Sequence, residues 1–262
     1  MKDDDLRGKT ALVTGASGGV GFRVAEKLAA RGACVIINAR TQDKAESAVA
    51  SLRALSPDAA YVLGDCGDYA TATRVVQEAA ALGGGRLDIL VSAGAQGVVS
   101  PMPFAEMTGE QLVTAFETRM FARIFPVHAA VPLLREHGGA VVMLGTDAGR
   151  HPTPGESVMG AVGAGVILMT KTLAKEFSRW SIRVNTVAMT LTSDTPSWER
   201  IFGGEDAFQS KLFTKLSEKF PSGRPPTSEE IARVVVFLAT DESAQVTGQT
   251  ISANGGLSFG GW

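Results

Sequence analysis

The chain has 262 residues, a length that suits one α/β domain or two small ones. With 45% hydrophobic and 20% charged residues it can build a sizeable core, and this composition excludes a disordered chain. The formal net charge of −2 gives no electrostatic reason to expect a nucleic acid or an anionic membrane as a partner.

Cysteines, histidines and the first residues of the chain indicate an ordinary intracellular protein. Cys34 and Cys66 each adjoin an apolar run, so we expect two buried thiols rather than a disulfide. The three histidines are scattered and show no metal-ligand spacing, so no metal is expected. The first thirty residues lack a charged region followed by an apolar one, and the weakly polar run 157–170 is too short and glycine-rich to span a bilayer. We therefore expect a soluble, cytoplasmic protein.

Short β-branched runs alternate with longer helical patterns along the chain. Seven strands are predicted, in chain order, at TALVTG, CVIINA, AAYVLG, DILVS, GAVVMLG, IRVNTVA and QTIS. Helical patterns follow the first six strands, at about 20–31, 42–55, 69–82, 108–136, 157–180 and 228–240. This alternation predicts an α/β fold, a single Rossmann-type doubly wound domain over 1–262, with a seven-stranded parallel sheet and helices on both faces.

One segment, 189–226, interrupts the alternation with several prolines, glycines and aromatic residues. A long excursion after a late strand is typical of a flap over a substrate pocket. The alternative is a small helical insert packed on the core, and both descriptions can hold at once.

The turn after the first predicted strand reads TGASGGVG and is rich in glycine. Gly15, Gly19 and Gly21 permit a tight turn and let backbone N–H groups, including that of Ser17, approach a pyrophosphate. The helix that begins near Val20 directs its positive end at that anion. Glycines placed directly after the first strand of a βαβ unit predict a dinucleotide site, the alternative being a purely structural turn.

The second predicted strand ends at Ala39, followed by Arg40. An acidic residue there would accept both ribose hydroxyls of NAD(H), whereas a guanidinium suits a 2′-phosphate, so NADP(H) is favoured over NAD(H). A surface arginine without a ligand is the alternative. Further cofactor contacts are expected after the third and fourth strands, at Asp65, Cys66, Ala93 and Gly94. Asp65 could accept from the adenine amino group or only cap its own turn.

These motifs resemble those of the short-chain dehydrogenase/reductase family, over nearly the whole chain. TGASGGVG matches the family's T-G-x-x-x-G-x-G, and residues 223–256 closely follow its C-terminal block. LDILVSAG is similar to its fourth strand and Asn-Asn-Ala-Gly motif, although both asparagines are missing. The resemblance implies a nicotinamide cofactor, a small-molecule substrate and a homo-oligomer, a dimer or tetramer paired through the two long helices.

The family's chemistry uses a Tyr, a Lys one helical turn later, a Ser and an Asn, and this chain departs from that set. Aligned without gaps backwards from KTLA, Met159 stands at the Tyr position and Gly163 at the Lys position. Thr146 falls at the Ser position and Arg119 at the Asn position. No tyrosine follows Tyr69, and no lysine lies between residues 44 and 171, so the loss does not depend on the register of the alignment.

Thr146 could keep the role of the family's Ser, and four other residues near the same predicted pocket could take over the missing roles. Thr146 could polarise a substrate oxygen, Asp147 could orient a water, and His151 could titrate near neutrality. The alternatives are a turn-capping aspartate and a solvated loop histidine. Arg119 could bind an anionic substrate group or form a surface salt bridge. Glu156 could serve as an acid, or simply stabilise the start of the following helix.

Three functions remain open. The favoured one is an NADP(H)-binding oxidoreductase with a non-standard active site, acting on a carbonyl or activated C=C of a hydrophobic or CoA-type substrate. The second is a catalytically silent subunit that forms a hetero-oligomer with an active homologue. The third is a non-redox isomerase, dehydratase or cyclase. The retained glycine turn and Arg40 favour the first, whereas the loss of the Tyr, Lys and Asn favours the second.

Overall fold

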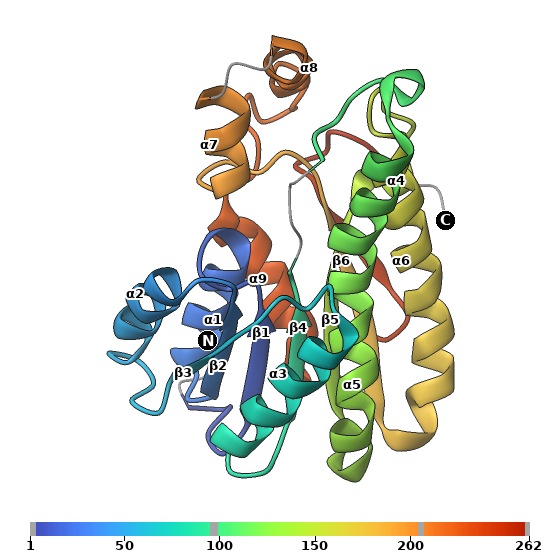
Figure 1. Ribbon diagram of the computed structural model, residues 1–262. Helices are drawn as coiled ribbons and strands as arrows, with labels where there is room; N and C mark the ends of the chain where they lie inside the picture. Colours follow the sequence, from blue (N-terminus) through green and yellow to red (C-terminus); the bar gives the residue numbers. More distant parts are fainter. Residues whose placement is uncertain (1–3, 95–98, 204–206, 260–262) are drawn as a thin grey trace.

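The computed structural model describes residues 4–94, 99–203 and 207–259, without the side chains of 207–209, and contains one seven-stranded parallel sheet (Figure 1). The strand order is β3-β2-β1-β4-β5-β6-β7. The strands are β1 (Thr10–Thr14), β2 (Cys34–Ala39), β3 (Ala60–Leu63), β4 (Ile89–Ser92), β5 (Gly139–Thr146), β6 (Ile182–Met189) and β7 (Thr250–Ala253). The predicted doubly wound, Rossmann-type α/β fold is confirmed.

Helices connect the strands as the sequence pattern indicates. The α-helices are α1 (Gly19–Ala29), α2 (Gln42–Leu52), α3 (Tyr69–Leu82), α4 (Gly109–Phe116), α5 (Ala122–His137), α6 (Ser157–Phe177), α7 (Pro196–Gly203), α8 (Ala207–Ser217) and α9 (Ser228–Ala239). Short helical turns are η1 (Phe104–Glu106), η2 (Glu117–Phe121), η3 (Asp147–Gly149), η4 (Ser178–Trp180) and η5 (Asp241–Ser243).

The core has two halves, one on each face of the sheet. Successive side chains of a strand point to opposite faces, so Val13 packs towards α1 and α9 while Leu12 packs towards α3 and α5. Both faces of β1 are fully buried. This burial explains why the strands read as continuous apolar runs rather than as an alternation of apolar and polar residues.

The predicted long helix at 108–136 is not continuous. Between α4 and α5 the backbone widens into one π-helical turn, Glu117–Phe121. Apolar residues continue at helical spacing through this turn, so the sequence pattern gives no sign of it. A π turn rotates the side chains that follow relative to those before it, and such turns are frequent at functional sites. Arg119 lies within this turn.

Helix α6 is longer than the run 157–170 considered in the sequence. With η4 it extends over Ser157–Trp180 and is the one helix in the described ranges that is long and apolar enough, by length and composition, to cross a membrane. One face of it, including Val162, Val166 and Ala174, is buried within the protein. The core helix of a soluble protein has these same properties.

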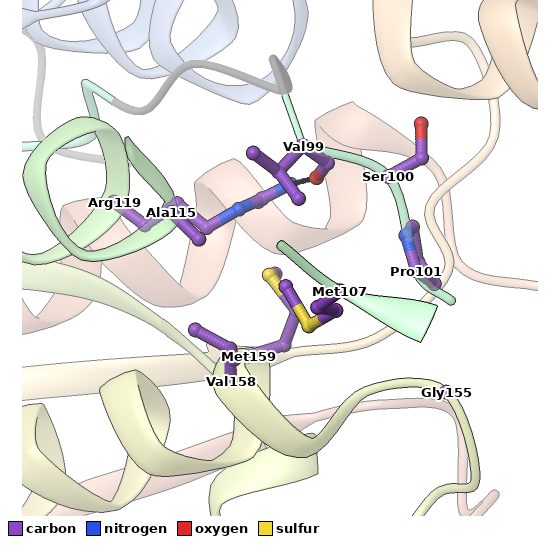
Figure 2. A pocket seen from close by; sticks show the side chains of 9 residues that line it. All are labelled: Val99, Ser100, Pro101, Met107, Ala115, Arg119, Gly155, Val158 and Met159. Atoms are coloured by element: carbon purple, nitrogen blue, oxygen red, sulfur yellow. Dashed lines mark hydrogen bonds between the residues drawn. The ribbon is translucent and has the colours of Figure 1, made fainter. Parts of the chain in front are cut away.

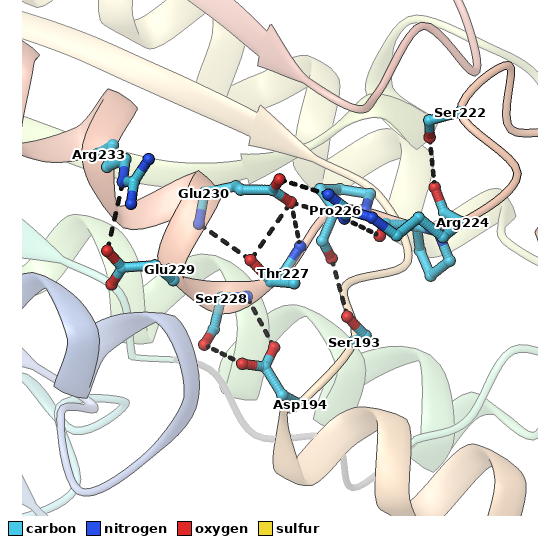
Figure 3. A network of polar contacts seen from close by, with 11 residues as sticks. Ser193, Asp194, Ser222, Arg224, Pro226, Thr227, Ser228, Glu229, Glu230 and Arg233 are labelled. Atoms are coloured by element: carbon cyan, nitrogen blue, oxygen red, sulfur yellow. Dashed lines mark hydrogen bonds and ion pairs between the residues drawn. The ribbon is translucent and has the colours of Figure 1, made fainter.

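Residues 189–226 contain α7 and α8, which project beyond the end of the sheet (Figure 1). Leu191, Phe213 and Phe220 form a buried cluster of their own, separate from the two halves of the main core. A polar network ties the segment to the start of α9, where the backbone N–H and hydroxyl of Ser228 donate to the carboxylate of Asp194 at 2.7 and 2.9 Å (Figure 3). The segment is therefore a helical insert anchored at both ends; its role as a flap stays a prediction.

Candidate active site

The loops after β1 and β4 meet at the carboxyl edge of the sheet, where β1 lies between β2 and β4. Gly15 has φ +64°, and a Cβ atom there would lie 2.8 Å from Gly94 Cα. Thr14 fixes this approach because its Oγ1 accepts from the N–H groups of Ala93 and Gly94, both at 3.1 Å. In sheets of this type, dinucleotides bind at the point where the strand order reverses. The glycine at position 15 is therefore required by the fold at the expected cofactor position.

The start of α1 has the properties of an anion-binding turn. The N-cap residue Gly18 supplies no side-chain hydrogen bond, so the first N–H groups of the helix lack a side-chain acceptor. A Cβ on Gly21 would lie 2.8 Å from the carbonyl oxygen of Gly15, so only glycine lets the helix begin this close to the turn. Together with Ser17, Gly19 and Val20, these residues fit a pyrophosphate at the positive end of a helix.

The residues expected around the adenosine end lie on two neighbouring loops. Arg40 is exposed directly after β2. Asp65 is exposed after β3, and its Oδ1 accepts from the Gly67 N–H at 2.9 Å, so it does cap its own turn. Cys66 lies beneath this surface, where its thiol donates to Asn38 Oδ1 at 3.4 Å. Burial raises the pKa of Cys66 to about 12, so this thiol is a core group and not a nucleophile.

Backbone atoms surround Gly163, the position that the sequence alignment predicts for the family's lysine. Gly163, on α6, packs against η3, and a Cβ atom there would lie 2.8 Å from Thr146 Cγ2 and 3.0 Å from Gly149 Cα. A Cβ on Gly160, one turn earlier, would lie 2.8 Å from the carbonyl oxygen of Ala148. The glycines of α6 therefore allow the loop after β5 to lie directly on the helix. Thr146, at the start of that loop, accepts from the Ala148 N–H at 3.2 Å.

A small cavity is lined in part by Met159, the residue predicted at the position of the family's tyrosine. It has a volume of about 10 Å³, room for about one water molecule. Its lining residues are Val99, Ser100, Pro101, Met107, Ala115, Arg119, Gly155, Val158 and Met159. Figure 2 shows the sulfur atoms of Met107 and Met159 below the guanidinium of Arg119. Arg119 Nη2 donates to the carbonyl oxygen of Val99 at 2.7 Å.

Arg123 is a second arginine behind Arg119, not itself a lining residue of the cavity, and the sequence reasoning missed it. Only 9% of its surface is exposed. Its Nε donates to the carbonyl oxygen of Leu144 at 2.5 Å, and its Nη1 donates to the carbonyl oxygen of Arg119. Burial lowers the pKa of Arg123 to about 10, so it remains charged at neutral pH. Its signal in the sequence is a charged residue within an apolar helical stripe, one turn after Arg119.

Asp147 is placed to hold the wall of the site together. It is 5% exposed, and its carboxylate accepts from Ser252 Oγ at 2.8 Å and from Asn254 Nδ2 at 2.5 Å. Arg150, on the same loop, donates to Ser252 Oγ at 2.8 Å. These bonds join the loop after β5 to the segment after β7. They occupy both oxygens of Asp147, which leaves this carboxylate poorly placed to activate a water.

His151 and Glu156 both lie between β5 and α6. His151 Nε2 is buried and has no hydrogen-bond partner among the described residues. Glu156 is the N-cap residue of α6, and burial raises the pKa of its carboxyl, an effect that the nearby Arg119 opposes. Elsewhere in the described ranges, no cluster of three His, Cys, Asp or Glu side chains could hold a metal ion.

Comparison with known proteins agrees with this geometry. The family model described as "Enoyl-(Acyl carrier protein) reductase" matches residues 15–258. The "3-oxoacyl-[acyl-carrier-protein] reductase FabG" of Staphylococcus aureus is 31% identical over 252 residues, which cover 95% of this chain and 98% of the relative. The "Acetoacetyl-CoA reductase" of Acinetobacter sp. is 32% identical over 253 residues, covering 95% and 97%.

A solved structure, described as a short-chain alcohol dehydrogenase from Sinorhizobium meliloti 1021, superposes with a TM-score of 0.87 at 29% identity, over 98% of each chain. The fold, the glycine turn and these matches over nearly the full length agree with one another. The chain belongs to the short-chain dehydrogenase/reductase family of oxidoreductases.

Proposed function

We propose that the protein is an NADP(H)-dependent oxidoreductase with a non-standard active site, acting on a carbonyl or an activated C=C of a hydrophobic or CoA-type substrate. The observation that carries this proposal is the close packing of the glycine turn. Gly15 lies against Gly94, and Gly21 lies against the carbonyl of Gly15, so closely that neither glycine could carry a Cβ atom. A domain with no use for a dinucleotide has no need of this geometry. The relatives named as 3-oxoacyl and acetoacetyl reductases support a carbonyl substrate.

The residues of the chain would divide the work as follows. Gly15, Ser17, Gly19, Val20 and Gly21 would hold the pyrophosphate. The 2′-phosphate would pair with Arg40, and the adenosine and ribose would lie against Asp65, Cys66, Ala93 and Gly94. When bound, the nicotinamide supplies or accepts a hydride at its C4 atom.

The proton in this reaction needs another source, because Met159 and Gly163 cannot donate one. The hydroxyl of Thr146 accepts a hydrogen bond from Ala148 and can still donate its own hydrogen to a substrate oxygen. His151, with a buried and unpartnered Nε2 within the described residues, is the proposed acid on the same loop. Asp147 serves this site by positioning the loop rather than by touching the substrate.

A catalytically silent subunit is the second candidate. Two observations favour it, namely the cavity of about 10 Å³ and the backbone contact that fills the position of the family's lysine. Such a subunit would assemble with an active homologue in a hetero-oligomer. The oxidoreductase proposal instead requires that the methionine side chains move when a substrate enters, which their three rotatable bonds permit.

We also propose a soluble, cytoplasmic homo-oligomer, a dimer or a tetramer. Leu168 on α6 is 66% exposed, and Val113 on α4 is 57% exposed. Large apolar side chains on two adjacent helices favour an interface there. Light scattering coupled to size-exclusion chromatography measures the state of the purified chain; a monomer at micromolar concentration would contradict this part.

Two measurements test the function. Fluorescence titration with NADPH and NADH should show binding, with NADPH the tighter ligand. Absorbance at the nicotinamide band should then show oxidation of NADPH in the presence of acetoacetyl-CoA or other carbonyl compounds. Binding without turnover of any carbonyl or enone in a broad panel supports the silent subunit, and binding of neither dinucleotide removes both forms of the proposal.

A further inference from the structure

Arg119 brings a positive charge to the wall of the candidate active site, and Arg123 adds a second one behind it, with no carboxylate in contact with either. Within the described ranges, neither Arg119 nor Arg123 forms an ion pair within 4.0 Å. Arg31, which is also buried, shows the usual arrangement, because it pairs with Asp5 and with Glu242. Arg123 is buried and Arg119 is partly buried. A buried charge ordinarily has a counter-ion, so the unpaired arginines indicate that something else supplies one.

The hydrogen bonds of this pair leave its charge uncompensated. Arg119 donates to the carbonyl oxygen of Val99, and Arg123 donates to those of Leu144 and Arg119. Carbonyl groups carry no net charge, so they solvate a guanidinium without neutralising it. The Nε of Arg119 is buried and has no acceptor within the described part of the chain. One donor of this planar, fork-shaped group thus lies covered by the protein without an acceptor.

The charged groups nearby do not balance the pair. Glu156 is close enough for its charge to act on Arg119, but it makes no ion pair with it, and burial raises the pKa of its carboxyl. Arg200 of α7 acts on Arg119 as a further positive charge. The field at this wall is therefore positive and attracts an anion.

The surface beside the guanidinium is apolar. Met107, Val158 and Met159 line the same cavity as Arg119 (Figure 2). A fitting ligand has an anionic group attached to a hydrocarbon part. Two of these three side chains are methionines, which can change rotamer and so enlarge the cavity of about 10 Å³.

We infer that Arg119, supported by Arg123, binds a carboxylate of the substrate, and that the hydrocarbon part of the substrate lies against Met107 and Met159. This inference rests on the proposed function. Among the carbonyl and activated C=C compounds proposed there, it favours oxo acids, saturated or unsaturated, and disfavours their CoA thioesters and amides. Arg123 is a positioning residue, because it bonds to the backbone of Arg119 and adds charge behind it. The planar guanidinium can hold both oxygens of a carboxylate at once.

The test uses two probes of equal length that cannot react, hexanoate and hexanamide. Each is titrated calorimetrically into the full chain without cofactor. We expect hexanoate to bind about 10 to 100 times more tightly than hexanamide, which corresponds to the range of charge-assisted hydrogen bonds. Arg119→Gln should remove this preference, and Arg119→Lys should retain part of it. The matched control Arg135→Gln, on the exposed end of α5, should leave it unchanged.

Equal binding of the two probes by the unaltered chain would overturn the inference, as would a preference that survives Arg119→Gln. If Arg119→Gln does not fold, a crystal structure with hexanoate decides, because a carboxylate in hydrogen-bond contact with Arg119 supports the inference and any other position contradicts it. The titration needs no cofactor, so a failure of NADPH binding would refute the proposed function while leaving the carboxylate site to be judged separately.

Discussion

Gly149 and Gly163 face each other across the junction of η3 and α6, and the gap between them admits no side chain. A Cβ atom on Gly149 would lie 2.5 Å from the Ala164 backbone nitrogen, and one on Gly163 would lie 3.0 Å from the Gly149 nitrogen. The absence of a lysine at position 163 is therefore built into the packing of two backbones. A lysine introduced there would first have to push the loop away from the helix.

This contact predicts that Gly149→Ala destabilises the protein. The added methyl group meets backbone atoms, which cannot rotate away, and overpacking of this kind costs about 1–3 kcal/mol of unfolding free energy. The matched control is Gly109→Ala at the start of α4, where a Cβ meets nothing within 4 Å. Urea denaturation followed by circular dichroism measures both variants. Equal unfolding free energies for Gly149→Ala and Gly109→Ala would contradict the prediction, because they would show that the loop moves to accommodate the methyl group.

Arg40→Asp tests the cofactor preference. The new carboxylate would repel a 2′-phosphate and could accept from the ribose hydroxyls of NADH. We expect the Kd for NADPH to rise by about 10 to 100 times, in line with the loss of one charge-assisted contact, while the Kd for NADH stays level or falls. Arg135→Asp makes the same charge change far from the turn and should affect neither. A parallel weakening of both dinucleotides would remove the phosphate assignment.

The pH dependence of stability is expected to report on Glu230, at the junction of the helical insert and α9 (Figure 3). Its carboxylate accepts from Arg224 at 2.9 and 2.7 Å and from the Thr227 N–H at 2.8 Å. These bonds, chiefly those from Arg224, lower the pKa of Glu230 to about 2. Because the folded pKa lies below the unfolded value of about 4.3, the stabilisation is complete above that value and is lost as the pH falls towards 2.

Glu230→Gln isolates this contribution. At pH 7 the variant should be less stable than the unaltered protein by up to about 1 kcal/mol, since the ion pair is exposed and solvent screens it. The difference should shrink as the pH falls from about 4.3 towards 2. Glu218→Gln, an exposed glutamate outside any ion pair among the described residues, should change neither value. A difference in unfolding free energy between Glu230→Gln and the unaltered protein that stays constant down to pH 2 would contradict the lowered pKa of Glu230.

Cys66 should resist alkylation while the protein is folded. With a pKa of about 12, only about one Cys66 thiol in ten thousand is ionised at pH 8. Cys34 is only half-buried, so iodoacetamide should modify it first. Mass spectrometry of the alkylated peptides measures the order, and denaturation with urea should make the two rates similar. Fast modification of Cys66 in the folded chain would place it in a reactive site.

The cofactor half of the site could be predicted from sequence because its features are local. A glycine turn between a strand and a helix, followed by Arg40 at the end of the next strand, lies within thirty residues and depends on backbone geometry that only certain residues permit. The parallel sheet followed from the alternation of apolar runs for a similar reason. Its inner strands, such as β1 and β4, are buried on both faces, so their composition is constrained throughout.

For the catalytic residues, the sequence predicts only that the family's Tyr, Lys and Asn are missing. The spacing predicts that Met159 and Gly163 stand in place of proton-handling groups, but the surroundings of these two residues depend on contacts between distant segments. The π turn that carries Arg119 leaves no mark in the apolar pattern. From the sequence, Asp147 is a candidate catalytic residue. Its hydrogen-bond partners Ser252 and Asn254 lie more than a hundred residues further along the chain, so only the folded structure shows that its carboxylate is occupied. Arg123 went unnoticed because its burial is a tertiary effect.

The first residue of α7 sits over the glycine turn, where Pro196 Cδ lies 3.3 Å from the position of a Cβ on Gly19 and Pro196 Cγ lies 3.6 Å from one on Gly18. A pyrophosphate on that turn and the helical insert are therefore neighbours, and each constrains the other. Thermodynamic reciprocity links the two: if a bound dinucleotide stabilises the ordered α7, then the ordered α7 raises the affinity for the dinucleotide by the same factor. Any dinucleotide affinity measured for this chain would then depend on the position of α7 as well as on the glycine turn itself.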